Sequence, residues 1–313
     1  MIAALYDAPL PPLDRSQLFS TQFDFVPVAM IVVALALYLW GVRRNNVLHP
    51  RHRWSVGKTV AWIGALVTTG IAIFSFVGVY DGELFWDHMV QHVMLIMVAA
   101  PLFAIASPVR LAFNATTGAS HIAVTEVLRS APAKVLGHPV TAFILYAVFI
   151  PVSHLTAWYN YTLQHETVHN AEHLAFLLVG YLFWRQIFGD DPNCYRMHPA
   201  LQFFYLFLAI PVDTFTGLSL ASATHEMFPA YCDTVRTLGC AGVSVLHPWG
   251  PSYVNDLHIG GDVMWVVGDT LMMWPMVPVA IRWMRMDERR AVRVDRELDA
   301  QMAAAAPTRS AGS

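Results

Sequence analysis

The chain has 313 residues and a formal net charge of −3, with 56% hydrophobic and only 13% charged residues. Soluble domains carry about 25% charged residues, so this composition, with a mean hydropathy of +0.46, argues against a soluble domain and for an integral membrane protein. The charge balance and the lack of a dense Lys/Arg face exclude a nucleic-acid partner.

Seven apolar stretches are long enough to cross a lipid bilayer as helices, which takes roughly 20 residues each. In chain order they are 25–42, 59–80, 88–107, 138–158, 168–188, 199–223 and 259–282. No long polar linker separates them, so we predict one all-α, seven-helix transmembrane domain over residues 25–285. Residues 1–24 are predicted to be an extracytoplasmic segment without a cleaved signal peptide, and residues 286–313 a charged, mobile cytoplasmic tail.

The basic residues predict the orientation, because cytoplasmic loops of membrane proteins are enriched in Lys and Arg. With seven spans, seventeen of the nineteen Lys and Arg residues fall on one side, and only Arg15 and Arg236 fall on the other. We therefore predict that the N-terminus is outside and the C-terminus is cytoplasmic. The segment 107–137 is too polar to span and is expected to lie along the inner membrane surface.

Nine of the fourteen histidines fall on the outer side of this topology. Three sets of residues spaced four apart open the third, fifth and seventh spans: His88 and His92; His165, His169 and His173; His258 and Asp262. Residues four apart share one helix face, and two imidazoles so placed can hold one metal ion. Because polar groups inside a bilayer are costly and usually functional, the three sets predict a shared metal or cofactor site.

The other residues of this region have a plainer interpretation. A lone histidine such as His154 or His225 more often hydrogen-bonds a neighbour or a lipid headgroup. For the methionines of the third and seventh spans, packing is the default interpretation: Met89, Met94, Met97 and Met264.

The residue types favour copper over zinc. Imidazole suits zinc, copper and iron, whereas thioethers favour Cu(I). Met89 lies between the two histidines of the third span, and Met227 and Met264 lie near the outer ends of later spans. Cu(I) would add a single positive charge, which Asp262 or Asp87 could balance. We therefore predict Cu(I), with zinc as the alternative, at these positions: His88, Met89, His92, His165, His169, His173, His258 and Asp262.

Two further pairs of polar residues each allow two interpretations. Asp213 and Asp269 lie deep in the sixth and seventh spans, where they serve an ion or proton path or make hydrogen-bonded packing contacts with nearby threonines. Cys232 and Cys240 lie in one outer loop, where a disulfide is expected and thiolate copper ligation is the alternative.

Three sequence motifs resemble those of a known family. The third span begins FWDHMVQH, the fifth begins HNAEHLAF and is followed by GDDP, and the seventh contains DLHIGGDVMW. At these intervals they are similar to the bacterial caa3-type cytochrome c oxidase assembly factors, the CtaG proteins, over about residues 25–285. The resemblance carries five residues over as metal positions: His88, Met89, His92, His169 and His173. At position 258 this chain has His where the family pattern often has Gln, so His258 is either not a ligand shared by the family or an added ligand of a subgroup.

What the resemblance implies is an assembly role without turnover chemistry. The protein would help to mature a haem–copper oxidase in the bacterial plasma membrane by binding copper on the outer side. Its partners would be cytochrome c oxidase subunits and the lipid bilayer, with a soluble periplasmic copper donor as a further candidate.

Other functions fit the same residues. One is a seven-span zinc-dependent membrane hydrolase, in which a zinc-bound water is the nucleophile. Another is a b-type haem membrane protein with His92 and His173 as axial ligands. Copper import past Asp213 and Asp269 is compatible with the assembly role.

Overall fold

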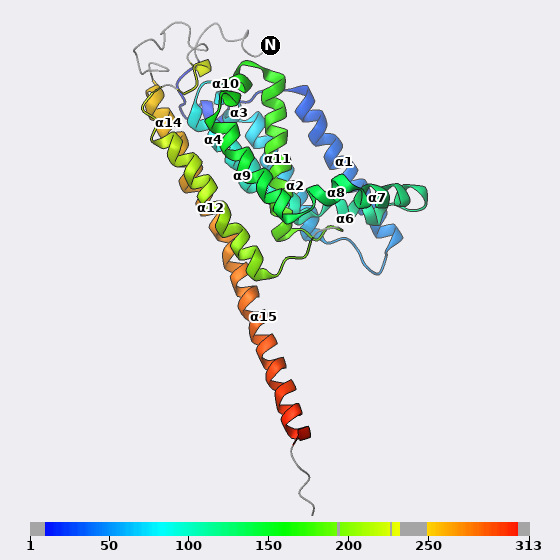
Figure 1. Cartoon of the computed structure of the whole chain (residues 1–313). Helices are drawn as coiled ribbons and strands as arrows, with labels where there is room; N and C mark the ends of the chain where they lie inside the picture. The colour runs from blue at the N-terminus through cyan, green and yellow to red at the C-terminus, as the bar shows by residue number, and fades with distance from the viewer. Residues whose placement is uncertain (1–9, 193–194, 226, 232–248, 306–313) are drawn as a thin grey trace, which may run out of the picture.

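The computed structural model describes residues 10–192, 195–225, 227–231 and 249–305, and these residues form helices and connecting loops without a strand (Figure 1). The prediction of an all-α membrane bundle is confirmed. In chain order the elements are η1 (Gln17–Phe19), α1 (Phe25–Leu48), α2 (Val56–Phe74), α3 (Phe76–Tyr80), α4 (Phe85–Val93), the π-helical η2 (Met94–Ala99), α5 (Ala100–Ala106), α6 (Pro108–Ala115), α7 (Ala119–Arg129), α8 (Ala131–Leu136), α9 (Pro139–Leu155), α10 (Ala157–Gln164), α11 (Glu166–Phe188), α12 (Pro199–Ala221), α14 (Tyr253–Asp262), the π-helical η3 (Val263–Val267) and α15 (Gly268–Ala305).

Among the described residues, five helical stretches are long and apolar enough to cross a membrane. They are Phe25–Leu48, Val56–Tyr80, Phe85–Ala115, Pro199–Ala221 and Tyr253–Met302. A sixth is obtained if α9 and α10 count as one span, although the chain bends by 70° between them. The remaining predicted span, 168–188, lies in α11, whose polar side chains include Glu172 and Arg185. The chain is thus a multi-pass membrane protein, while seven spans and the orientation of the termini stay predictions.

Two π-helical turns interrupt the long helices. The first is η2, which joins α4 to α5. Pro101 follows it by two residues, and because proline has no N–H it cannot donate to the carbonyl four residues earlier. The second is η3, which joins α14 to α15. Single π turns inside α-helices occur frequently at functional sites, and both turns border the same interior cavity.

The backbones of α12 and α14 touch at Gly217 and Gly261. A Cβ atom on Gly217 would lie 2.8 Å from the carbonyl oxygen of Gly261, and one on Gly261 would lie 2.6 Å from the carbonyl oxygen of Gly217. Small residues at helix crossings permit this close approach in membrane proteins. The contact holds η3, which begins two residues later, against α12.

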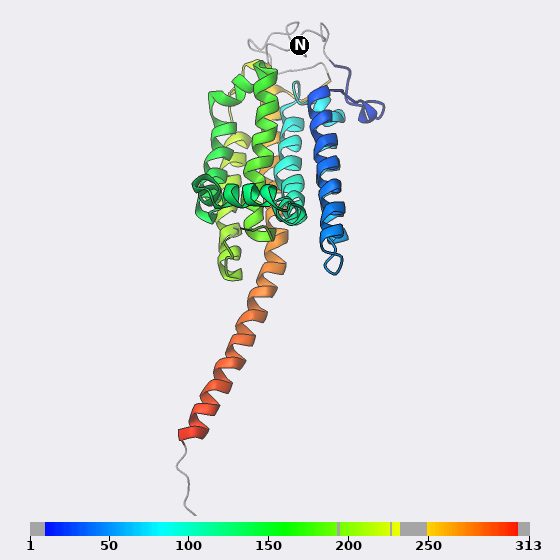
Figure 2. The same cartoon turned by 90° about the vertical axis from the view of Figure 1, so that its right-hand side faces the viewer.

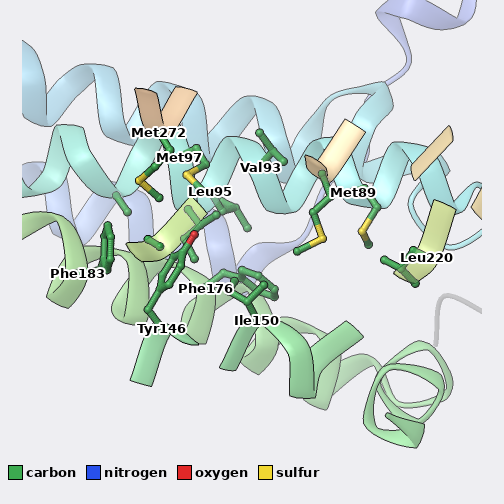
Figure 3. Packing of buried hydrophobic residues seen from close by; sticks show 14 of the residues in the cluster. Met89, Val93, Leu95, Met97, Tyr146, Ile150, Phe176, Phe183, Leu220 and Met272 are labelled. Carbon is green, nitrogen blue, oxygen red and sulfur yellow. The ribbon is translucent and has the colours of Figure 1, made fainter. Parts of the chain in front are cut away.

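The main core lies between α4, η2, α9, α11, α12 and α15. Its side chains are large and apolar, among them Tyr146, Phe176 and Phe183 (Figure 3). The Trp184 ring donates a hydrogen bond to the carbonyl oxygen of Ile96 over 2.8 Å, which satisfies an acceptor in the π turn η2. By contrast, α1 lies at the edge of the bundle and most of its apolar side chains are exposed, as expected of a helix that faces lipid.

Two segments leave the bundle. The helices α6 to α8 cover most of 107–137, and α7 runs across the bundle axis (Figures 1 and 2), which is the geometry expected of a surface segment. At the other extreme, α15 continues far beyond the bundle to Ala305 (Figure 1), so most of the segment predicted as a mobile tail is helical.

The two ends of the bundle differ in charge. At one end Lys58, at the start of α2, and Arg110, in α6, both contact the carboxylate of Asp190 after α11. We call this the basic end. The opposite end contains the beginnings of α4 and α11 and their histidines, and we call it the histidine end.

Candidate metal centre

Four histidine rings from two helices meet inside the histidine end. His88 and His92 lie one turn apart on α4, and His169 and His173 lie one turn apart on α11. The ring centroids are 5.0 Å apart for His88 and His169 and 6.1 Å apart for His92 and His173. Three of the rings are buried, and His169 is 17% exposed at its side chain. We call these four residues the histidine cluster.

Three groups of side chains in this region could each hold one ion. In each group, one ligand atom per residue lies within 4.8 Å of the others. The groups are His88, His92 and His173; Asp81, His169 and His173; and His88, His169 and Glu172. Because the groups share histidines, they form one extended site that runs from the partly exposed His169 to the buried His92.

Two arrangements of protons fit the hydrogen bonds of the two histidines on α4. In both, His88 donates from Nδ1 to the carbonyl oxygen of Asp81 at 3.3 Å. In the first, Nδ1 of His154 donates to the carbonyl oxygen of Ile150 over 2.8 Å, and its Nε2 accepts from Nδ1 of His92, 3.1 Å away. In the second, Nδ1 of His154 accepts from the Ser153 hydroxyl at 2.9 Å, and His92 donates from Nε2 to His88. The first arrangement leaves a lone pair on Nε2 of both neutral rings on α4.

These two lone pairs face each other. The Nε2 atoms of His88 and His92 are 2.8 Å apart. Two acceptors at this distance repel unless a proton or a metal ion lies between or beside them. Two imidazole nitrogens that bind one ion at about 2.0–2.1 Å in tetrahedral geometry lie about 3.3 Å apart, so a small rotation of the rings would create two ligands.

The facing ring of His173 is also set up as a ligand. Both of its nitrogens are buried without a hydrogen-bond partner among the described residues, and so is Nε2 of His169. A buried polar atom left without a partner costs about 1–3 kcal/mol. A cation bound between α4 and α11 would remove this cost, because imidazole nitrogens are common metal ligands.

Asp81, in the loop between α3 and α4, contacts the histidine cluster. Its carboxylate accepts a hydrogen bond from the Gln91 amide at 3.0 Å and lies 4.0 Å from Nε2 of His169. Its carbonyl oxygen accepts from His88 and from the Tyr231 hydroxyl. Burial raises the pKa of the Asp81 carboxyl to about 7, against the hydrogen bond from Gln91, which lowers it. A bound cation would favour the ionised form.

Contacts from other helices fix the position of α4. Asp256, on α14, accepts hydrogen bonds from the backbone N–H groups of Phe85 and Trp86 over 2.8 and 2.9 Å, and thereby caps the start of α4. Phe176 stacks on His92 with ring centroids 3.9 Å apart. These contacts hold the rings in place and surround them with apolar groups that exclude water.

The structure separates the sequence-predicted residues into two sets. It brings His88, His92, His169 and His173 together, and it buries Met89 on the same helix beside them. The other three lie apart from every group of the described residues that could hold one ion: His165 is exposed and stacks on Tyr161, His258 hydrogen-bonds the carbonyl oxygen of Ala223, and Asp262 is exposed. The site proposed below does not include these three.

Three residues near the site were not predicted as ligands. His154 was interpreted as a histidine that hydrogen-bonds a neighbour, and the structure gives it that contact, with His92. Glu172 lies three residues after His169, so the helical period could have identified it. Asp81 lies in a loop, where no periodicity exists to indicate it.

The deep carboxylates make hydrogen bonds. Asp213 accepts from the Tyr146 hydroxyl at 2.6 and 2.8 Å, and Asp269 accepts from the Thr214 hydroxyl at 2.6 Å, which is one of the threonine contacts considered above. The predicted disulfide between Cys232 and Cys240 lies outside the described residues.

These features define a multi-pass helical membrane protein with a cluster of histidines between two of its core helices. The chain matches the sequence model of the cytochrome c oxidase caa3 assembly factor family over residues 36–286 and belongs to that family. The resemblance noted from the motifs is thereby confirmed.

Curated relatives extend beyond this chain. An uncharacterized protein of Mycobacterium leprae is 29% identical over 305 residues, which cover 95% of this chain and 44% of that protein. Uncharacterized proteins of Mycobacterium bovis and Mycobacterium tuberculosis are each 28% identical over 309 residues, with the same coverage. The chain therefore spans less than half the length of these relatives. No solved structure matches it.

Proposed function

We propose that this protein is an assembly factor for a haem–copper cytochrome c oxidase, and that it binds copper at the histidine cluster and passes it to an oxidase subunit. Membership of the caa3 assembly factor family supports the assembly role. One observation carries the metal: the Nε2 atoms of His88 and His92 lie 2.8 Å apart, and both nitrogens of His173, in the same ligand group, lack a hydrogen-bond partner among the described residues.

The charge and donor types favour Cu(I). His88, His92 and His173 are neutral ligands, so a monovalent ion leaves only one positive charge to stabilise in a buried site. The carboxylates of Asp81 and Glu172, each within a neighbouring group, can balance that charge. Zinc remains the alternative, because zinc also binds histidine together with carboxylate.

The arrangement of the three ligand groups suits an ion that is transferred to another protein. His169 is the partly exposed member of the cluster and lies in both groups that contain a carboxylate. An ion can therefore bind first at Asp81 and His169 and then move inward to His92 through the shared ring of His173. Since basic residues mark the cytoplasmic side of membrane proteins, the histidine end faces the extracytoplasmic side of the bacterial plasma membrane, where a soluble periplasmic donor can reach it.

The test is metal analysis of the purified full chain in detergent under reducing, anaerobic conditions. We expect about one Cu(I) at the cluster, and the double variant His88→Ala/His92→Ala should bind it at least about tenfold more weakly, which corresponds to about 1.4 kcal/mol. The matched control is His258→Ala, at the same end but outside the cluster, which should bind copper normally.

Two results would reject this assignment. One is stoichiometric zinc in the native protein together with unchanged copper binding in the double variant, which would favour the zinc hydrolase alternative. The other is a deletion strain whose oxidase remains fully active and fully supplied with copper, because an assembly role requires oxidase polypeptides that are present but poor in copper.

A further inference from the structure

A small cavity lies next to the histidine cluster, deeper in the bundle. Its volume is about 20 Å³, enough for one guest of the size of a water molecule. It is lined by residues of α4, η2, α9, α11, α12, η3 and α15. Its distinctive lining residues are Met89, His92, Met97, His154, Asp213 and Met264. We call it the methionine cavity.

The wall of the methionine cavity combines soft donors with one carboxylate. Met89, Met97 and Met264 are 1%, 7% and 7% exposed, so their thioethers are removed from water. In Figure 3 the side chains of Met89 and Met97 extend from their helix toward the helices that carry Ile150 and Phe176. Asp213 also lines the cavity, and both of its carboxylate oxygens lie within hydrogen-bond distance of the Tyr146 hydroxyl, which donates to them.

Packing alone does not account for this arrangement. Methionine is flexible and normally fills irregular gaps in a core, and protein interiors are close-packed with few voids as large as a water molecule. Here three methionines line a void. Two of them, Met97 and Met264, lie on the π turns η2 and η3. Because each π turn sacrifices regular helix geometry and such turns recur at functional sites, their convergence on one cavity points to a ligand.

We propose that the methionine cavity is a second Cu(I) site, in which the thioethers of Met89, Met97 and Met264 hold one ion that exchanges with the histidine cluster. This inference rests on the proposed function for the source of the ion. Thioethers select Cu(I) over harder divalent ions, and the single charge of Cu(I) can be balanced by Asp213.

The two sites share a wall. His92 belongs to the ligand group with His88 and His173, and the same ring lines the methionine cavity together with His154. An ion can therefore move between imidazole and thioether ligands without crossing an apolar gap. The second site would keep the copper reduced and away from water, since the rest of the lining, which includes Phe176 and Ile150, is apolar.

The test uses Cu(I), and Ag(I) as a redox-inert probe, on the purified full chain. We expect about two equivalents bound, and X-ray absorption of the copper-loaded protein should show sulfur neighbours as well as imidazole nitrogens. In the variant Met89→Leu/Met97→Leu/Met264→Leu, one equivalent and the sulfur signal should be lost, because leucine conserves volume but removes the donor. The control is Met30→Leu/Met273→Leu/Met284→Leu, which changes three exposed methionines and should bind two equivalents.

The outcomes separate this inference from the proposed function. If His88→Ala/His92→Ala binds copper as tightly as the native protein while the cavity variant loses the sulfur-bound ion, the cluster assignment fails and the cavity assignment stands. If native protein loaded with two equivalents shows no sulfur neighbours, the cavity assignment is overturned whatever the histidine variants do. That measurement needs no variant, so misfolding cannot obscure it.

Discussion

Nδ1 of His92 lies 3.1 Å from Nε2 of His154 on the neighbouring helix α9. When Nδ1 of His154 donates to the carbonyl oxygen of Ile150, 2.8 Å away, Nε2 of His154 accepts a hydrogen bond from His92. This chain of donors begins at His92 and leaves Nε2 of that ring free for a metal ion. Second partners of this kind orient metal-binding histidines and raise their basicity.

We expect His154→Phe to weaken copper binding by about 10- to 100-fold. Without an acceptor on α9, His92 gains by adopting the other tautomer and donating from Nε2 to His88. Metal binding must then move that proton to Nδ1, which has lost its acceptor in the variant, so the affinity falls although no net proton is released. Competition with a Cu(I) chelator measures this.

Two controls accompany this measurement. His154→Gln restores an acceptor and should recover part of the affinity, whereas His165→Phe alters an exposed ring outside the cluster and should have no effect. Native affinity in His154→Phe would show that His154 does not orient His92.

The helical period explains which part of the site the sequence could predict. His88 and His92, like His169 and His173, lie within regular helices, where residues four apart share a face. His165 does not, because it is the extended N-cap of α11, with φ −133° and ψ 94°, so its ring leaves the face of the other two. Periodicity applies only inside a helix, and a sequence alone does not locate its first residue to within one position.

Tertiary packing determines the features that the helical period does not predict. On α14 the rotation of the helix turns Asp256 and Gly260 toward α4, which leaves Asp262 exposed and directs His258 to a carbonyl of the preceding segment. Hydropathy likewise indicated one span over 138–158. In the structure the extended Thr156 ends α9, and its hydroxyl caps α10, which is bent by 70° from α9. Such choices depend on neighbours that are remote in sequence.

The crossing of α12 and α14 gives a prediction about stability. Gly217→Ala would place a Cβ atom 2.8 Å from Gly261 O and 2.8 Å from the Cβ of Trp265 in η3, so the two helices must separate. Overpacking of this kind typically costs about 1–3 kcal/mol. We expect a lower thermal unfolding midpoint in detergent, together with weaker Ag(I) binding at Met264, which lies next to Trp265 on the displaced turn.

Gly70→Ala is the matched control for this change. Gly70 lies inside α2, where an added Cβ would make only an ordinary van der Waals contact, 3.8 Å from the Phe74 ring. Alanine there also favours the helix over glycine by about 1 kcal/mol, so its midpoint should not fall. Equal midpoints for the two variants would mean that α12 and α14 do not cross in contact.

The basic end gives a pH-dependent prediction through Asp190. Partial burial acts to raise the pKa of this carboxyl, but hydrogen bonds and charges from Lys58 and Arg110 outweigh it, so the pKa lies below its usual value. A carboxyl whose pKa is lower in the folded state stabilises the fold above its unfolded pKa, and this stabilisation is lost as the pH falls through the folded pKa. Because the side chain is 45% exposed, the gain is screened and should stay below about 1 kcal/mol.

We therefore expect Asp190→Asn to lower the unfolding midpoint slightly at pH 7, with the difference from the native protein shrinking below about pH 4, near the carboxyl's unfolded pKa. High salt should reduce the same difference, because exposed ion pairs are screened. Asp262→Asn, which changes an exposed carboxylate outside any ion pair among the described residues, serves as the control and should behave like the native protein at every pH. A deficit in Asp190→Asn that persists at pH 3 would show that the side chain acts through packing and not through its charge.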